Sequence, residues 1–205
     1  MTDLERAALV ISECQRGILD PGVAIFKGIA DHATDRGMVP NIARLVQAFR
    51  AAGRPVVHCT IQHRPDLAGV LPNSMLGSMT LRDRRMIAGS PDVEIPAEIA
   101  PRVEDFVSCR ATGITAFYGT DLDATLRLQG VDTIVLTGVS TNLALPGFSI
   151  EAVNRGYRVI LPEDATAGTS AELHSMMITN LLAVLTRVTT TDAVLAQLNA
   201  LPRSS

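Results

Sequence analysis

Short apolar runs recur along the chain and alternate with stretches whose apolar residues have helical spacing. The runs occupy residues 7–12, 55–60, 105–109, 133–137, 158–162 and 187–190. Charged residues, glycine or proline flank them, as is typical of strands. Strand and helix patterns that alternate about six times predict an α/β fold, in which a parallel sheet has helices on both faces.

One helix is clear from its spacing alone. Ile42, Leu45, Val46 and Phe49 fall at i, i+3, i+4 and i+7, and Gly53 follows as a stop signal. Weaker helical patterns end at Gly130, Gly156, Leu185 and Leu201.

Two long stretches show no sustained period. We expect residues 19–39 to form a loop, because they carry Pro21, Gly22, Gly28 and Gly37. Residues 61–100 are irregular, and only residues 75–86 have the pattern of a short helix. A stretch this long without regular structure is usually functional or a packing arm.

The stretch TIVLTGVSTNLALPGFSIEA, residues 133–152, predicts a buried strand that ends at Gly138 and continues as a helix. The residues after the break are three common helix N-caps, Ser140, Thr141 and Asn142. Unpaired backbone N–H groups at such a helix start face the carboxyl end of the strand, where they favour a negatively charged oxygen. Pro146 requires that the helix begins close to it or is distorted there.

Length, composition and charge narrow the class of protein. The 205 residues are 47% apolar, which predicts one domain over residues 1–205. A net charge of −3 without a long basic tract argues against nucleic-acid or membrane-surface binding. The acidic amino terminus and the lack of a long apolar segment predict a cytoplasmic protein. Three cysteines without paired spacing predict free thiols.

Two segments, ALVISECQRG at residues 8–17 and the stretch from Gly119 to Gly168, resemble the isochorismatase-like superfamily of hydrolases. This superfamily includes nicotinamidases, carbamoyl-sarcosine amidases and isochorismatases. The resemblance extends from Ala7 to about Thr190, and residues 117–168 are its most specific part. It implies a three-layer α/β/α fold with a six-stranded parallel, doubly wound sheet, usually assembled as dimers or tetramers. It also implies an Asp–Lys–Cys triad whose thiolate attacks an amide or related carbonyl.

The sequence differs from that triad at all three positions. The family aspartate aligns with Glu13, the lysine with Arg110, and the cysteine of a TNVCV segment with Ala144 of TNLAL. An alanine methyl group cannot form a covalent intermediate, so the thiol mechanism does not apply at this position. Cys14 and Cys109 lie next to the other two positions and are the candidates for a displaced nucleophile.

The resemblance also implies a chemistry that needs no cysteine. Isochorismatases lack the thiol, and there an acidic residue protonates an enol ether before water completes the cleavage. Glu13 is the candidate acid or base, and Arg110 the candidate for binding a substrate carboxylate. The family's oxyanion-binding N–H groups correspond to Ser140 and Ala144, and a cis peptide is expected at Val139–Ser140. A preorganised pair of donors stabilises negative charge with or without an adjacent nucleophile.

Other candidate binding residues are Gln15, His63, Phe117 and Tyr118. The family's Asp-x-His metal motif corresponds to residues 61–63, which keep the histidine and lose the carboxylate, so we expect no metal and no cofactor. Two hypotheses remain. The chain is either a hydrolase of a small, anionic molecule or a catalytically silent member that binds a small molecule or serves as a partner subunit. In either case we expect a homo-oligomer.

Overall fold

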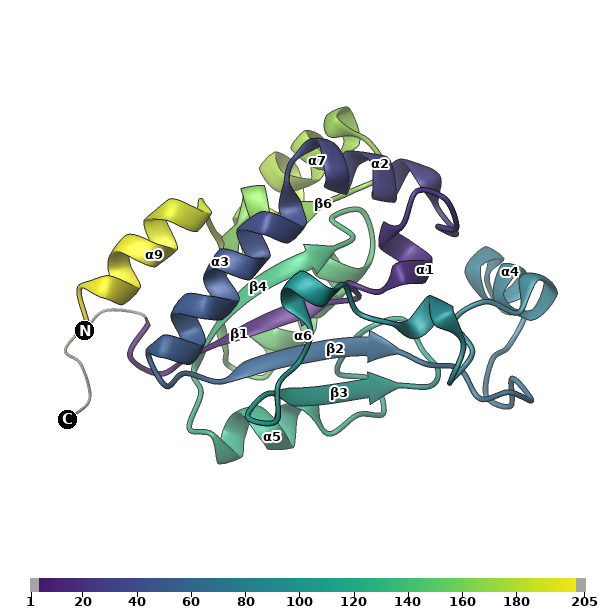
Figure 1. The fold of residues 1–205 in the computed structure, drawn as a ribbon, viewed down its shortest axis with the longest axis horizontal. Helices are drawn as coiled ribbons and strands as arrows, with labels where there is room; N and C mark the ends of the chain where they lie inside the picture. The colour runs from purple at the N-terminus through teal and green to yellow at the C-terminus, as the bar shows by residue number, and fades with distance from the viewer. Residues whose placement is uncertain (1–3, 202–205) are drawn as a thin grey trace.

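Six parallel strands form the central sheet of the computed structural model, which describes residues 4–201 (Figure 1). Their order across the sheet is β3-β2-β1-β4-β5-β7. The strands are β1 (Ala7–Ser12), β2 (Val56–Ile61), β3 (Phe106–Arg110), β4 (Thr133–Val139), β5 (Arg158–Pro162) and β7 (Arg187–Thr189). A two-residue strand, β6 (Thr166–Ala167), pairs with the end of β4. The order reverses between β1 and β4, which places a ligand crevice at their carboxyl ends.

Helices cover both faces of the sheet. The helices are α1 (Arg16–Leu19), α2 (Lys27–Asp35), α3 (Met38–Ala51), α4 (Met75–Asp83), α5 (Leu122–Leu128), α6 (Ala144–Asn154), α7 (Ala171–Met177), α8 (Ala183–Leu185) and α9 (Thr191–Asn199). Short 3₁₀ turns occupy Pro91–Val93, Ala97–Ile99 and Glu163–Ala165, and a π-helical turn, Ile178–Leu182, joins α7 to α8. These layers confirm the predicted α/β/α fold.

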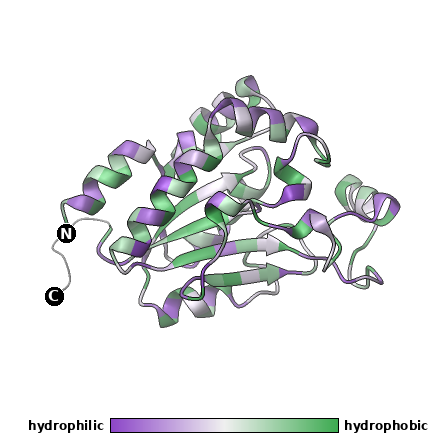
Figure 2. Cartoon of the chain, in the orientation of Figure 1, coloured by the Kyte–Doolittle hydropathy of each residue, from purple (hydrophilic) through white to green (hydrophobic). Residues whose placement is uncertain are grey.

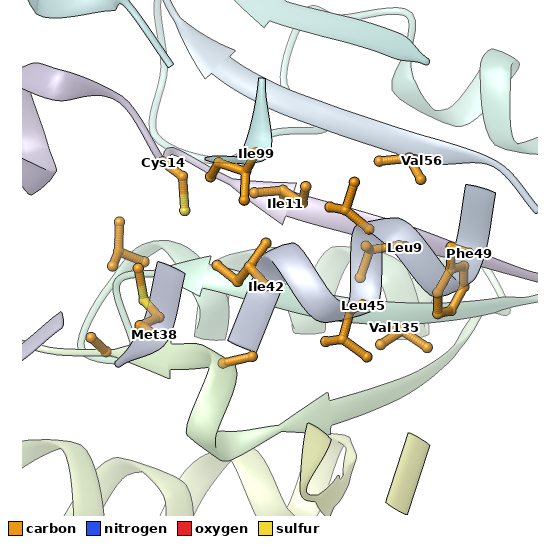
Figure 3. Close-up of a cluster of buried hydrophobic side chains, with 14 of the residues drawn as sticks. Leu9, Ile11, Cys14, Met38, Ile42, Leu45, Phe49, Val56, Ile99 and Val135 are labelled. Carbon is orange, nitrogen blue, oxygen red and sulfur yellow. The ribbon is translucent and has the colours of Figure 1, made fainter. Parts of the chain in front are cut away.

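Successive residues of β1 contribute to two separate cores, because side chains alternate between the faces of a strand. Leu9 and Ile11 pack with residues of α3, and Figure 3 shows this cluster. Ala8 and Val10 pack on the opposite face with residues of α5 and α6. The strands consist mainly of hydrophobic residues, whereas α3 and α9 carry both hydrophobic and hydrophilic residues (Figure 2). Among residues 4–201, no helix is long and apolar enough to cross a membrane.

Residues 19–39 are not a loop, contrary to the prediction. They contain the last residue of α1, all of α2 and the first residues of α3. The error has a physical cause at Gly28, because this glycine lies inside α2 instead of breaking it. A Cβ atom there would lie 2.5 Å from the carbonyl oxygen of Thr169, so the glycine allows α2 to pack closely. Residues 61–100 do contain the expected short helix, α4, and Met86 and Ile99 anchor the rest in the core.

The stretch that follows β4 also differs in detail from the prediction. The strand runs through Gly138 to Val139, and a cis peptide joins Val139 to Ser140 as expected. The N-cap of α6 is Leu143 and not Ser140, Thr141 or Asn142, and no side chain caps the helix. Pro146 is the third residue of α6, so the helix begins close to it. The turn between strand and helix is therefore held mainly by its backbone.

The two strands β1 and β4 leave no room for a side chain at Gly138. Its φ is +96°, and a Cβ atom would lie 2.2 Å from the carbonyl oxygen of Ser12, its partner in the strand register. Any larger residue would push apart the two strand ends that border the crevice.

We therefore expect Gly138→Ala to lower the free energy of unfolding substantially, as measured by urea denaturation. Gly130→Ala is the matched control, since Gly130 also has a positive φ, +67°, but has open space around its Cβ position. The control should cost about 1–2 kcal/mol from backbone conformation alone. Gly138→Ala should cost roughly 1–3 kcal/mol more, because it adds a steric clash. Equal losses in the two variants would contradict this account of the β1–β4 approach.

Candidate active site

A cavity of about 700 Å³ lies at the carboxyl ends of the central strands. Each strand end supplies one polar residue to its floor. Glu13 follows β1, His63 lies two residues beyond β2, Arg110 ends β3, and Ser140 follows β4. Parallel pairing brings these four residues together although they are far apart in the sequence. This placement matches the crevice expected at the reversal of strand order.

Glu13 has an unusual backbone conformation. Its φ is +56°, which is uncommon for a residue with a side chain. Its N–H donates to the carbonyl of Cys59 at 2.8 Å, and its own carbonyl accepts from the N–H of Gln15 at 2.9 Å. These bonds fix the chain where it leaves β1. Non-glycine residues in this region cluster at functional sites, where surrounding structure maintains them.

Arg110 pairs with Glu13 on the cavity floor. Its guanidinium donates one hydrogen bond from Nη2 to Oε1 of Glu13 and another from Nη1 to the carbonyl of Gly113 at 3.0 Å. The side chain of Arg110 is 6% exposed and that of Glu13 is 14% exposed. The pair brings no net charge to the floor, and its geometry fixes the orientation of the carboxylate.

The turn from Ser140 to Ala144 forms another part of the floor. The carbonyl of Ser140 accepts from the N–H groups of Leu143 at 3.2 Å and Leu145 at 3.0 Å, and Thr141 donates its N–H to Ala167 at 2.9 Å. Ala144 is the first residue of α6, so its N–H has no acceptor within the helix. Ser140, Asn142, Leu143 and Ala144 line the cavity. The helix start thus offers donors to an anionic oxygen.

Several other predicted residues have structural contacts instead. Gln15 is fully buried and does not line the cavity. Its side-chain amide donates to the carbonyls of Ile61 at 3.0 Å and Val93 at 3.1 Å, and its oxygen accepts from the N–H of Ile61 at 2.7 Å. Gln15 therefore joins the end of β2 to the 3₁₀ turn at Pro91–Val93.

The two aromatic candidates, Tyr118 and Phe117, lie in different environments. Tyr118 lines the cavity and is 58% exposed. Phe117 lies in the core instead, with its ring centroid 4.9 Å from that of Phe148 and the guanidinium of Arg155 4.5 Å from its centroid. His63 lines the cavity, and its Nδ1 lies 2.8 Å from the carbonyl oxygen of Ala111. This contact fixes the imidazole ring.

The sequence pattern missed a buried pair of histidines behind the Ser140–Ala144 turn. The rings of His32 and His174 meet edge to face with centroids 5.2 Å apart. His174 is 3% exposed, and its Nδ1 lies 3.2 Å from Oγ1 of Thr141. His32 Nδ1 lies 3.2 Å from the amide nitrogen of Gly168. Thr141 therefore supports the turn from behind and does not line the cavity.

None of the three thiols lines the cavity. Cys14 is buried in the core beside α3, and Cys59 is buried in the core on the opposite face of the sheet. Burial raises the pKa of both thiols well above the usual range. Cys109 is exposed but lies outside the cavity lining. Neither Cys14 nor Cys109 is therefore placed to act as a displaced nucleophile in this cavity.

The titratable side chains also bear on metal binding. Across residues 4–201, no group of three or more His, Cys, Asp or Glu side chains is arranged to hold a metal ion. His63 is the histidine on the floor, and its contact with the Ala111 carbonyl accounts for one of its two ring nitrogens.

Comparison with known proteins adds an independent finding. The family model described as isochorismatase domain matches residues 7–193. The isochorismatase family protein YecD of Escherichia coli O157:H7 is 30% identical over 92% of this chain and 94% of its own length. Ureidoacrylate amidohydrolase of Variovorax paradoxus is 29% identical over 78% of this chain and 68% of its own length. The crystal structure of a cysteine hydrolase from Pseudomonas syringae superposes with a TM-score of 0.83 at 28% identity, covering 95% and 93% of the two chains.

We expect a thiol reagent such as iodoacetamide to modify the native protein once, at Cys109. Cys14 and Cys59 are buried and stay protonated, so they should react only after denaturation. Intact-mass spectrometry and peptide mapping would measure the adducts. The Cys109→Ser variant is the control and should take up no reagent while native. Rapid native labelling of Cys14 would contradict the burial described above.

The free energy of unfolding should fall as the pH is lowered below about 6.5. Burial lowers the pKa of His174 to about 4, with the positive charge of Arg36 and the neighbouring His32 acting in the same direction. Between these two values the unfolded chain binds more protons than the folded one, so acid favours unfolding. His58, whose pKa burial also lowers to about 4, adds to the slope. Denaturant titrations at pH 7 and pH 5 should show a smaller difference for His174→Asn than for the wild type. An unchanged difference would contradict the assignment to His174.

Proposed function

The chain belongs to the isochorismatase family of hydrolases, and from this premise we propose that it hydrolyses a small anionic molecule without a cysteine nucleophile. Glu13 acts as the acid or base, and the Ser140–Ala144 turn stabilises the oxyanion. One observation carries the proposal. The carboxylate of Glu13, held by an uncommon backbone conformation, shares a cavity with the thiol-free helix start at Ala144.

The ion pair favours a role for Glu13 as a general base in the resting site. An unprotonated carboxylate has oxygen lone pairs that can accept a proton, and Arg110 fixes the direction of this one. Glu13 takes a proton from a water molecule, whose oxygen attacks the substrate carbonyl to form a tetrahedral intermediate. The intermediate then collapses to the carboxylic acid as the bond to the leaving group breaks, and Glu13 returns the proton to that group. The space beside the methyl group of Ala144, where the family has its sulfur, admits that water. For an enol ether, a protonated Glu13 instead donates its proton to carbon. Water then adds to the resulting oxocarbenium ion and returns a proton to Glu13, and the hemiketal breaks down to a ketone and the released alcohol.

The N–H groups of Ser140 and Ala144 donate hydrogen bonds to the substrate oxygen on which negative charge develops. Ala144 begins α6, whose N-terminal dipole adds a favourable field. Preorganised donors of this type contribute about 10²–10³ in rate each. Because Glu13 already neutralises Arg110, the positive end of the α6 dipole is the part of the floor that favours an anionic substrate. The relative that acts on ureidoacrylate, which is a carboxylate, supports an anionic substrate.

A second candidate is a catalytically silent protein that binds a small molecule or serves as a partner subunit. The observation that favours it is the engagement of Arg110 on both sides, by Glu13 and by the Gly113 carbonyl. Such a pair also forms in a site that has lost its chemistry. In either case we propose a cytoplasmic homo-oligomer, a dimer or tetramer, because three free cysteines suit a reducing compartment and the family resemblance implies assembly.

Glu13→Gln should lower turnover strongly in a chain that still folds, because the amide keeps the size of the side chain and a hydrogen-bond acceptor for Arg110. A panel of small carboxylate-bearing amides and enol ethers, followed by product chromatography, identifies a substrate first. Loss of the acid or base should then lower kcat by about 10²–10⁴. Glu172→Gln, an exposed carboxylate on α7, is the matched control and should retain full activity. Circular dichroism confirms folding of both variants.

Treatment with iodoacetamide separates the possible mechanisms. Activity that survives full modification of Cys109 and is lost in Glu13→Gln supports hydrolysis without a thiol. Full activity in Glu13→Gln, or complete loss on alkylation, would reject it. Absence of turnover across the panel, together with saturable binding, would favour the silent alternative.

A further inference from the structure

Apolar side chains form much of the cavity wall, and polar residues such as Asn73, Thr80 and Thr115 lie among them. One set of wall residues comes from α2 and the segment before it, and another from α4 and the segment before it. They are Ile25, Phe26, Ile29, Leu71, Met75 and Leu76. Substrates bind such walls by burying apolar surface, which contributes about 25 cal/mol per Å².

Charge is confined to the floor. Of the residues that line the cavity, Glu13 and Arg110 carry full charges, and they neutralise each other. A hydrophilic substrate body, such as a sugar or nucleotide, would place part of its hydroxyl or phosphate groups against these apolar side chains. Buried polar groups without partners cost about 1–3 kcal/mol each. The walls therefore select against such molecules.

The cavity is also large for a substrate of a few atoms. Its volume of about 700 Å³ lies in the upper part of the range for drug-sized ligands, about 300–1,000 Å³. One water molecule takes about 30 Å³ of liquid, so the space corresponds to on the order of 20 waters. A very small substrate would leave most of the apolar wall in contact with water.

Helix α4 exposes apolar side chains to solvent. None of its residues is buried, Met75 is 77% exposed, and Leu71 just before it is 62% exposed. In Figure 1, α4 lies beyond the carboxyl ends of β2 and β3, apart from the helical layers. A ligand that filled the space between α4 and the rest of the cavity would remove these side chains from water, which is favourable.

We infer that the substrate carries an extended apolar group, such as a medium-length acyl chain or a substituted aryl ring, attached to the polar group that is hydrolysed. This inference rests on the proposed function of the same cavity and adds the chemical class of the molecule. The polar end lies at Glu13 and the Ser140–Ala144 turn. The apolar group lies between α2 and α4.

A series of N-acylglycines tests the inference, because the carboxylate and amide stay constant while the tail lengthens from acetyl through butanoyl and octanoyl to dodecanoyl. Isothermal titration calorimetry with the wild type and with Glu13→Gln measures binding independently of turnover. We expect Kd to fall about threefold for each methylene added until the cavity is filled. A Kd that does not change with tail length would overturn the inference.

A wall variant localises the effect. Leu76→Gln places a polar group on α4 without disturbing the core, because no residue of α4 is buried. Kd for octanoylglycine should rise roughly fivefold, whereas Kd for acetylglycine should stay constant. Leu128→Gln is the matched control, since Leu128 is 86% exposed on α5 and outside the cavity lining. Equal effects of the two variants would overturn the inference.

The same measurements separate this inference from the proposed function. Tail-dependent binding without turnover of any panel compound supports the apolar subsite and rejects the hydrolase. Turnover of short carboxylates with no tail dependence rejects the subsite alone. A second copy of the chain is the other possible cover for α4. A wild-type dimer in sedimentation experiments that Leu76→Gln dissociates, with tail-independent binding, would assign the wall to that contact and overturn the inference.

Discussion

The site depends on the close parallel approach of β1 and β4. Ser12 pairs with Gly138 in the strand register, and only a glycine leaves room for the Ser12 carbonyl there. One residue further along each strand, the chain turns away, giving Glu13 on one side and the Val139–Ser140 peptide on the other. Wider separation of these strand ends would move the carboxylate out of reach of any molecule held at the α6 N-terminus. The fold and the geometry of the site therefore share one constraint.

The Glu13–Arg110 ion pair sets the electrostatics of the cavity. Both side chains are largely buried, and removing one partner of such a pair leaves an unpaired charge that typically costs about 3–5 kcal/mol. The ion pair spans three strands of the sheet, because Glu13 follows β1, Arg110 ends β3, and β2 lies between those two strands. Gln15 reinforces the same region by binding the end of β2 from below. The pair thus fixes the carboxylate and at the same time leaves the floor without net charge.

Sequence reasoning identified the elements whose signals are local. β5 spans Arg158–Pro162, as its apolar run predicted, and the cavity-lining positions of Glu13, Arg110 and Ala144 followed from a motif resemblance. Signals that depend on tertiary contacts were missed. Gly28 resembled a helix breaker because its close approach to Thr169 is invisible in one dimension. The burial of His174 was not predicted, because nothing local shows that Thr141 and His32 pack against it. The cavity walls on α2 were missed for the same reason, since the helix itself was not predicted.

The apolar side chains of the cavity wall bear directly on the proposed hydrolysis without a thiol. Hydrolysis without a covalent intermediate relies on backbone donors, and such donors are stronger where water is excluded and the local dielectric is low. A hydrocarbon group lying between α2 and α4 would remove water from above Ser140 and Ala144. The N–H groups of the α6 helix start would then act on the reacting oxygen with little screening. In the proposed site, where Ala144 takes the candidate nucleophile position, the binding of an apolar substrate body would itself supply the environment that the chemistry requires.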